Sequence, residues 1–180
     1  MSKKSNKKLE KFLKVLKSNK IKKNIRDAIS SIDREKFFDP FFKKDVFEFG
    51  PLPVGCGENS DDVIIMAKMI ELLSPKKNWR ILEVGTGSGY STAVLASLVK
   101  EVVTVEYHEG IAKEAKERLV SQGFFNIRFY TGDATEMTDD MGKFDGIIIF
   151  PACVKRPFSI IPLLKYDGPL VFPMGTPLQQ

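Results

Sequence analysis

The chain of 180 residues has few of the residues that build disulfide frameworks and metal centres, with two cysteines and one histidine. Cys56 and Cys153 are isolated, so neither a disulfide framework nor a zinc site is expected. The longest apolar stretch, residues 147–154, is interrupted by Pro151 and is far shorter than the roughly 20 residues that a membrane helix needs. No apolar signal segment follows the lysine-rich start. We therefore expect a cytoplasmic protein with no resident metal and no membrane partner.

The remaining composition is that of an ordinary globular domain. Apolar residues make up 43% of the chain and charged residues 28%, which excludes disordered and collagen-like proteins. A chain of this length can bury a core without disulfides or metals. The composition therefore predicts one folded domain.

Positive charge is concentrated at the N-terminus. Residues 1–23 hold ten lysines and one glutamate and so carry +9, which leaves −4 for the rest of a chain whose net charge is +5. The apolar residues of this segment recur at helical spacing and predict an amphipathic helix; they are Leu9, Phe12, Leu13 and Leu16. Contact with a nucleic acid or an anionic surface is one interpretation. Lysine without interleaved arginine or aromatics favours a solvated helix that caps a single domain formed by residues 24–180.

Two further helices and an irregular region are predicted before residue 80. Apolar spacing indicates a helix over residues 21–32. Residues 37–57 contain three prolines and several phenylalanines, which is typical of irregular chain packed onto a larger body. A helix is expected over residues 61–73, and its candidate N-caps are Asn59, Ser60 and Asp61.

After residue 77 short apolar strands alternate with helices. Strands are predicted at residues 80–84, 101–105, 126–130, 144–150 and 168–173, and helices at residues 91–99 and 110–122. This alternation indicates a doubly wound α/β fold with a mostly parallel sheet. In such folds the ligand lies outside the carboxyl ends of the strands, so the loops at those ends are expected to form the site.

The loop after the first of these strands is rich in glycine. Residues 83–90 read E-V-G-T-G-S-G-Y, in which glycines permit a tight turn and a close approach of the backbone to a ligand. The spacing is G-x-G-x-G rather than the G-x-G-x-x-G of dinucleotide-binding folds, and Tyr90 stands where the third glycine would be needed. A nicotinamide or flavin enzyme is therefore disfavoured.

Two acidic residues follow the next two strands. Glu106 lies 21 residues after Gly85, where a carboxylate can accept hydrogen bonds from both hydroxyls of an adenosine ribose. Asp133 follows the third strand, where its carboxylate could accept a hydrogen bond from the amine of adenine. Each acid alone is typical of a solvated strand end, but together they indicate an adenosine pocket.

These residues resemble a known family. E-V-G-T-G-S-G-Y, Glu106 and Gly132-Asp133 look like a class I S-adenosylmethionine-dependent methyltransferase. D-R-E-K-F at 33–37, G-P-L-P-V-G at 50–55 and V-F-P-M-G-T-P-L-Q at 171–179 look more narrowly like the protein-L-isoaspartate O-methyltransferases. The resemblance spans residues 21–180, and the P-L-P-V-G segment is its most specific part.

The resemblance implies a donor, a substrate class and a set of site residues. The implied donor is S-adenosylmethionine, with S-adenosylhomocysteine as product, and the implied partners are peptides and proteins with isoaspartyl residues, which argues against a nucleic acid partner. The implied donor-binding residues are Glu83, Gly85, Thr86, Gly87, Ser88, Gly89, Glu106, Tyr107, Gly132, Asp133 and Ala134.

Two departures from the family pattern affect the expected active site. Asp61 stands where the family has an active-site serine, and Ser60 lies one residue earlier, so both are the candidate catalytic residues. The alternatives are a different acceptor, with Asp61 as base or cation-binding group, and a non-catalytic adenosyl-binding module. The chain also ends at Gln180, where the family's sheet continues, so the C-terminal strands are expected to be truncated.

Overall fold

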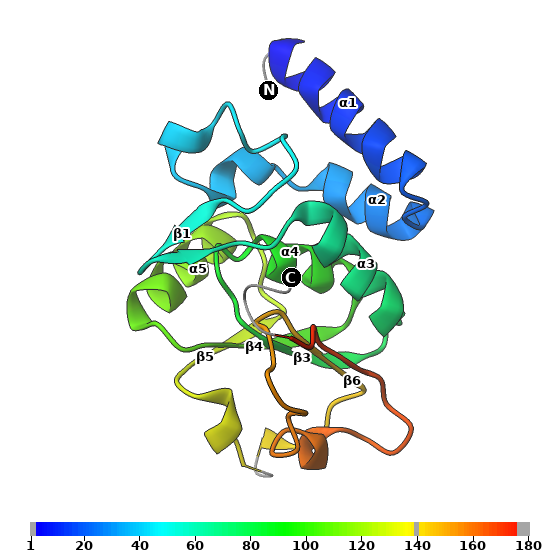
Figure 1. The fold of residues 1–180 in the computed structure, drawn as a ribbon, viewed down its shortest axis with the longest axis vertical. Coiled ribbons are helices and arrows are strands. Elements are labelled where there is room, and N and C mark those ends of the chain that lie inside the picture. The colour runs from blue at the N-terminus through cyan, green and yellow to red at the C-terminus, as the bar shows by residue number, and fades with distance from the viewer. Residues whose placement is uncertain (1–2, 139–140, 176–180) are drawn as a thin grey trace.

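The computed structural model describes residues 3–138 and 141–175, which contain a parallel sheet of five strands (Figure 1). The strand order is β5-β4-β3-β6-β7, and every neighbouring pair is parallel. The strands are β3 (Arg80–Val84), β4 (Glu101–Glu106), β5 (Ile127–Thr131), β6 (Gly146–Ile149) and β7 (Leu170–Val171). The predicted α/β fold with a mostly parallel sheet is confirmed.

Helices cover one face of this sheet. They are α3 (Val63–Leu73), α4 (Tyr90–Leu98) and α5 (Glu109–Ser121), and the largest set of buried apolar residues lies between them and the sheet. The other face carries a second cluster built around Leu82, Val103 and Ile147. In the described part of the chain, loops and short 3₁₀ helices rather than α-helices cover that face, among them η3 (Ala134–Glu136) and η5 (Ile161–Leu163).

The start of α3 differs from the prediction. Its N-cap is Asp62, whose Oδ1 accepts hydrogen bonds from Ile64 N–H at 2.7 Å and Ile65 N–H at 3.3 Å. Asn59, Ser60 and Asp61 were the wrong candidates, because the preceding residues form an antiparallel hairpin of β1 (Pro53–Gly55) and β2 (Glu58–Asn59). Its turn, Cys56-Gly57, has positive φ at both residues. The irregular chain predicted for residues 37–57 is found up to Leu52 and includes the short 3₁₀ helix η2 (Pro40–Phe42), and the last residues of that range form β1 and the turn of the hairpin.

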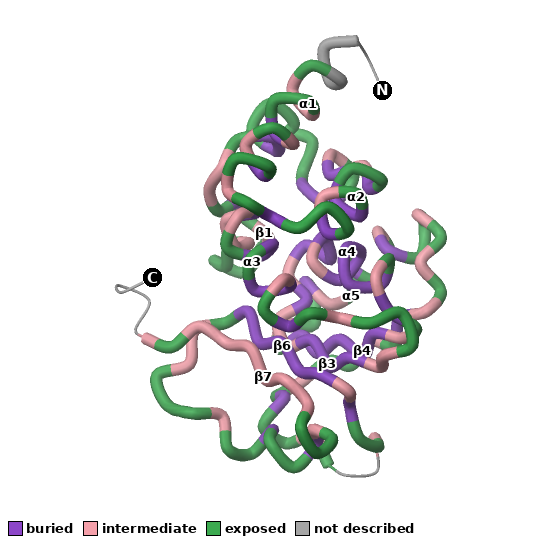
Figure 2. Tube along the Cα trace, turned by 90° about the vertical axis from the view of Figure 1, so that its right-hand side faces the viewer, coloured by how far each residue is buried: buried purple, intermediate pink, exposed green. Residues whose placement is uncertain are grey.

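The lysine-rich segment forms α1 (Lys3–Ser18), followed by α2 (Lys23–Ser31). Phe12 and Leu16 are fully buried, and the Phe12 ring stacks on Phe49 with centroids 5.1 Å apart. Figure 2 shows that the buried side of α1 faces the rest of the molecule while its outer side is exposed. The apolar stripe of this helix therefore joins the common core, as expected for a helix that caps the domain. None of the described helices is both long enough and apolar enough to cross a membrane.

The described C-terminal end is short. β7 contains only Leu170 and Val171, where a strand over residues 168–173 is predicted, and residues 176–179 of the V-F-P-M-G-T-P-L-Q motif lie outside the described residues.

Candidate active site

A cavity of about 660 Å³ lies at the carboxyl ends of the strands. Its walls are the loops after β3, β4, β5 and β6, part of the β1–β2 hairpin, and the residues between β2 and α3. The volume is in the range of small-molecule sites, about 300–1,000 Å³. The cavity thus lies where the rule for open parallel sheets places a ligand.

The three glycines after β3 have different packing requirements. All three have positive φ. A Cβ on Gly85 would lie 2.7 Å from Pro151 Cδ, and one on Gly89 would lie 3.1 Å from Leu119 Cδ1. A Cβ on Gly87 would meet nothing within 4 Å. Gly85 and Gly89 are therefore required by the packing of the protein itself, whereas Gly87 borders open space at the cavity.

Glu106 is a buried carboxylate that lines the cavity. Its Oε2 accepts a hydrogen bond from Gly87 N–H at 3.0 Å, and its Oε1 accepts one from His108 N–H at 3.1 Å. An ionised carboxylate has about four acceptor positions, so two remain for a ligand. Glu106 thus links the glycine loop to the chain after β4 and can still bind a pair of hydroxyls.

Asp133 is exposed and lines the cavity after the neighbouring strand β5, between Gly132 and Ala134, which also line the cavity. Its Oδ1 accepts hydrogen bonds from Thr135 N–H at 2.8 Å and from the Thr135 hydroxyl at 2.7 Å. These two bonds lower the pKa of Asp133, so the side chain is ionised at neutral pH. Tyr107, 70% exposed, forms part of the same wall.

Glu83 is placed differently from the other predicted donor-binding residues. It is 0% exposed and is not among the residues that line the cavity. Its carboxylate accepts hydrogen bonds from Ser91, Thr92 and Thr104, at 2.6–2.7 Å. Burial raises its pKa to about 7, although these three hydroxyls act in the opposite direction. Direct contact between Glu83 and a ligand remains a prediction, as it does for Gly89.

Glu83 nevertheless influences the glycine loop through a chain of hydroxyls. Thr104 donates its single proton to Glu83, and its oxygen lies 2.6 Å from Thr86 Oγ1. Thr86 must therefore donate to Thr104. Thr86 and Ser88 are both buried and both line the cavity, so the loop is anchored from behind by this chain.

The two candidate catalytic residues both line the cavity. Ser60 Oγ accepts a hydrogen bond from Leu52 N–H at 3.0 Å, and Ser60 N–H donates to the Leu52 carbonyl at 2.8 Å. Asp61 is half-buried; burial first, and the charge of Asp62 second, raise its pKa to about 6. Ser60 is thus positioned by two hydrogen bonds to the backbone of Leu52, while Asp61 is a carboxyl group with a pKa close to neutral pH.

Two residues without a predicted role also line the cavity, Arg34 and Tyr90. Arg34 belongs to the D-R-E-K-F motif, and Tyr90 is the last residue of the E-V-G-T-G-S-G-Y motif. An arginine followed by aromatic residues was the available signal in the sequence. Its position against α4 could not be known, because it depends on contacts between segments about 56 residues apart in the sequence.

Comparison with known proteins agrees with this geometry. The family model of protein-L-isoaspartate(D-aspartate) O-methyltransferase matches residues 5–180. A protein-L-isoaspartate O-methyltransferase of Photobacterium profundum is 39% identical over 155 residues, which cover 86% of this chain and 74% of that protein. The one from Pectobacterium carotovorum is 37% identical over 175 residues, which cover 97% and 84%.

Solved structures give the same result for the fold. A protein-L-isoaspartate O-methyltransferase structure has a TM-score of 0.81 at 27% identity and covers 95% of this chain, which spans 56% of that longer one. A Plasmodium falciparum structure, described as such an enzyme in complex with S-adenosyl-L-homocysteine, has a TM-score of 0.79 at 19% identity and covers 93% of this chain and 84% of its own. The resemblance found in the sequence is thereby confirmed, and the chain belongs to the protein-L-isoaspartate(D-aspartate) O-methyltransferase family.

Proposed function

We propose that this chain methylates isoaspartyl carboxylates of damaged proteins in the cytoplasm, with S-adenosylmethionine as methyl donor. The observation that carries the proposal is the position of Glu106 at the end of β4. Its carboxylate accepts a hydrogen bond from Gly87 N–H and still has acceptor positions free at the cavity. Family membership supports the same donor and the same reaction class.

The charge of the cavity suits this donor. S-adenosylmethionine carries a positive sulfonium, and the acids Glu58, Asp61, Glu106 and Asp133 line the cavity. Among the described residues no lysine lines it, which disfavours ligands with a phosphate chain. Glu106 would hold the ribose hydroxyls, Asp133 the adenine amine, and Gly87 the close approach of the ligand to the backbone. S-adenosylmethionine supplies an electrophilic methyl group when bound.

The reaction makes modest demands on the residues of the chain. An isoaspartyl carboxylate has a pKa near that of free aspartate, about 3.9, and is ionised at pH 7 without a general base. The protein's task is to orient this carboxylate and to exclude water. Ser60 suits the orienting role, because its oxygen accepts from Leu52 N–H while its own O–H is used in no hydrogen bond to a described residue.

A radiolabelled methyl donor tests this proposal directly. The wild-type chain is incubated with an isoaspartyl peptide and, separately, with its aspartyl twin of the same sequence. We expect base-labile methylation of the isoaspartyl peptide alone. Equal labelling of both peptides, or labelling of neither while S-adenosylhomocysteine still binds, would contradict the proposed acceptor.

A second candidate reaction is favoured by one observation, the pKa of about 6 at Asp61. A carboxylate with this pKa is a competent general base near neutral pH and could activate a neutral acceptor in place of an anionic one. In that case kcat/KM would rise with pH through about 6 and then level, and Asp61→Asn would abolish turnover. An isoaspartyl carboxylate, already ionised throughout this range, predicts no such rise.

A further inference from the structure

Arg34 is a buried cation at the wall of the cavity. It begins the 3₁₀ helix η1 (Arg34–Phe37) and is 3% exposed, yet it lines the cavity. Its Nε donates a hydrogen bond to the Val46 carbonyl at 2.6 Å. The guanidinium carbon lies 4.5 Å from the centroid of the Tyr90 ring and 4.9 Å from that of Phe38. The side chain is thus fixed by one carbonyl and by two aromatic rings.

The hydrogen-bonding capacity of this corner is incompletely used. Arg34 Nη2 and the Tyr90 hydroxyl are both buried, and neither has a hydrogen-bond partner of good geometry within residues 3–138 and 141–175, although the two side chains interact favourably with each other. A guanidinium offers five N–H donors, and a buried donor without a partner is destabilising, the more so when it is charged. Asp62 interacts favourably with the charge of Arg34, but its Oδ1 caps α3. Two donors are therefore left for a ligand.

The surroundings make this corner the natural place for an anion. Arg34 is the one arginine or lysine among the described residues that line the cavity, whose other charged walls are acidic. The planar guanidinium is the side chain best matched to a carboxylate. Among the described lining residues, Arg34 is therefore the positively charged group that would attract a carboxylate entering this cavity.

We propose that Arg34 is the carboxylate-binding group of the cavity, and that the Tyr90 hydroxyl donates a second hydrogen bond to the same carboxylate. This inference rests on the proposed function, which brings two carboxylates to the cavity: that of the methionyl part of the donor and that of the isoaspartyl acceptor. The chemistry is the same for both, and the experiment distinguishes them.

The experiment compares the wild type with Arg34→Met in two binding arms and one kinetic arm. Calorimetry measures the affinity for S-adenosylhomocysteine and for methylthioadenosine, which has the same adenosyl group but no carboxylate. Steady-state kinetics measure KM for an isoaspartyl peptide. Arg128→Met, the same substitution on β5 at the opposite end of the sheet, is the matched control and should change none of the three values.

Two results support the proposal and identify the carboxylate. If Arg34 binds the carboxylate of the donor, the affinity for S-adenosylhomocysteine falls at least tenfold while the affinity for methylthioadenosine is unchanged. If Arg34 binds the carboxylate of the acceptor, both affinities are unchanged and KM for the isoaspartyl peptide rises at least tenfold. Tyr90→Phe should shift the same quantity in the same direction by a smaller factor.

Two results overturn it. An equal loss of affinity for both adenosyl ligands would show that Arg34 only supports the fold of the cavity, and no change in any arm would show that it binds no carboxylate. If Arg34→Met does not fold, wild-type protein and Arg34→Lys are tested with S-adenosylhomocysteine carboxamide and with an isoasparaginyl peptide as inhibitor. Neutralising either carboxylate must then weaken binding at least tenfold in the wild type and by less in Arg34→Lys. The donor arms need no turnover, so failure of the isoaspartyl assay alone contradicts the proposed function and not this inference.

Discussion

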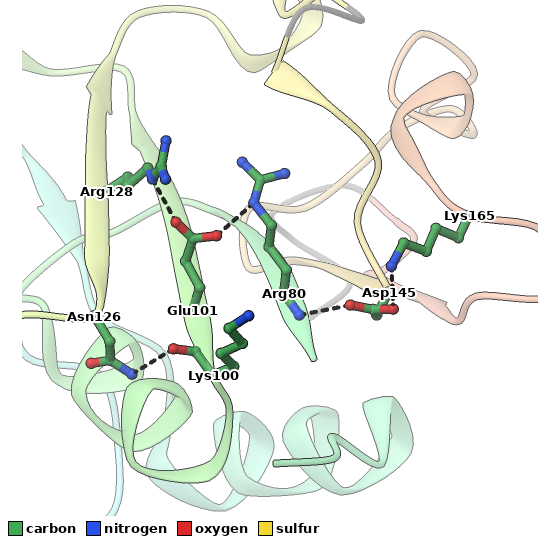
Figure 3. A network of polar contacts seen from close by, with 7 residues as sticks. All are labelled: Arg80, Lys100, Glu101, Asn126, Arg128, Asp145 and Lys165. Carbon is green, nitrogen blue, oxygen red and sulfur yellow. Dashed lines mark hydrogen bonds and ion pairs between the residues drawn. The ribbon is translucent and has the colours of Figure 1, made fainter. Parts of the chain in front are cut away.

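Strand β4 begins with Glu101 and ends with Glu106, and the two glutamates meet opposite surroundings. Glu101 is bound by two guanidinium groups, with Arg80 Nε at 2.7 Å and Arg128 Nε at 2.5 Å (Figure 3). Within the described residues, Glu106 accepts hydrogen bonds from two backbone N–H groups and from no side chain, and it lines the cavity. The charge of Glu101 is thus balanced by two arginines, whereas no arginine or lysine is paired with Glu106 among the described residues.

Two aspartates repeat the contrast. Burial alone would raise the pKa of Asp145, but hydrogen bonds from Arg80 N–H and Lys165, each 2.7 Å long, outweigh it, and its pKa is lowered. Asp61 has no such partner among the described residues, so burial raises its pKa to about 6. Asp61, beside the cavity, is therefore a carboxyl whose burial costs stability, whereas Asp145, at the other end of the sheet, is stabilised by its partners. This is the pattern expected where binding has been favoured over stability.

The largest expected effect is on stability and involves Glu83. The folded chain holds its proton up to about pH 7, whereas the unfolded chain releases it near the ordinary value of about 4.5. Because the folded state binds more protons in this window, the unfolding free energy falls as pH rises from 4.5 to 7. Relative to Glu83→Gln, the wild type should lose up to about 3 kcal/mol. Urea unfolding of both at pH 5 and pH 8 measures the difference.

Asp145→Asn is the control of opposite sign. The pKa of Asp145 is lowered on folding, so its contribution is present above its unfolded value of about 3.8 and is lost as pH falls below that value. Its variant should therefore be less stable than the wild type at pH 7, and the difference should shrink as the pH falls below about 3.8. A pH-independent difference for Glu83→Gln would contradict the assigned burial effect.

The next effect concerns donor affinity and uses Glu106→Gln. Each hydrogen bond to the charged carboxylate contributes about 1.5–3 kcal/mol, so affinity for S-adenosylhomocysteine should fall roughly 10- to 150-fold. Calorimetry measures this change. Unaltered affinity would exclude Glu106 from the donor site.

Glu101→Gln, at the other end of the same strand, should have a smaller and different effect. Losing the charge between Arg80 and Arg128 should lower the unfolding free energy by about 1 kcal/mol and leave the affinity for S-adenosylhomocysteine unchanged. Parallel denaturation and calorimetry compare the two glutamates. A loss of donor affinity comparable to that of Glu106→Gln would remove the distinction between the two ends of the sheet.

The smallest effect is expected for Asp61→Ser. If the acceptor is an isoaspartyl carboxylate, removal of a nearby negative charge should leave kcat/KM within about threefold or raise it, because electrostatic repulsion is reduced. A loss of about 10²–10⁴-fold, typical of a missing general base, would favour the neutral acceptor. Circular dichroism and donor affinity check that the variant is folded.

The sequence by itself determined the sheet and, at its carboxyl edge, acidic residues that line the cavity. The strand predicted at residues 80–84 has those bounds in the structure, since a short segment rich in aliphatic residues and followed by glycine is a local signal. Glu106 and Asp133 were found because the ends of parallel strands meet at one edge. The family membership followed from contiguous motifs. All of these signals lie within a few neighbouring residues.

Tertiary structure decided which way the polar side chains face. Glu83 and Glu106 were both predicted to contact the donor, but only packing shows that Glu83 turns inward to Ser91, Thr92 and Thr104. Asp62 rather than Asp61 caps α3 because the hairpin sets the start of the helix. Arg34 reaches the cavity only where η1 packs on Tyr90 of α4. Burial and pairing between distant segments fix these outcomes, and no local pattern of residues encodes the dielectric surroundings or the partner that a side chain will meet.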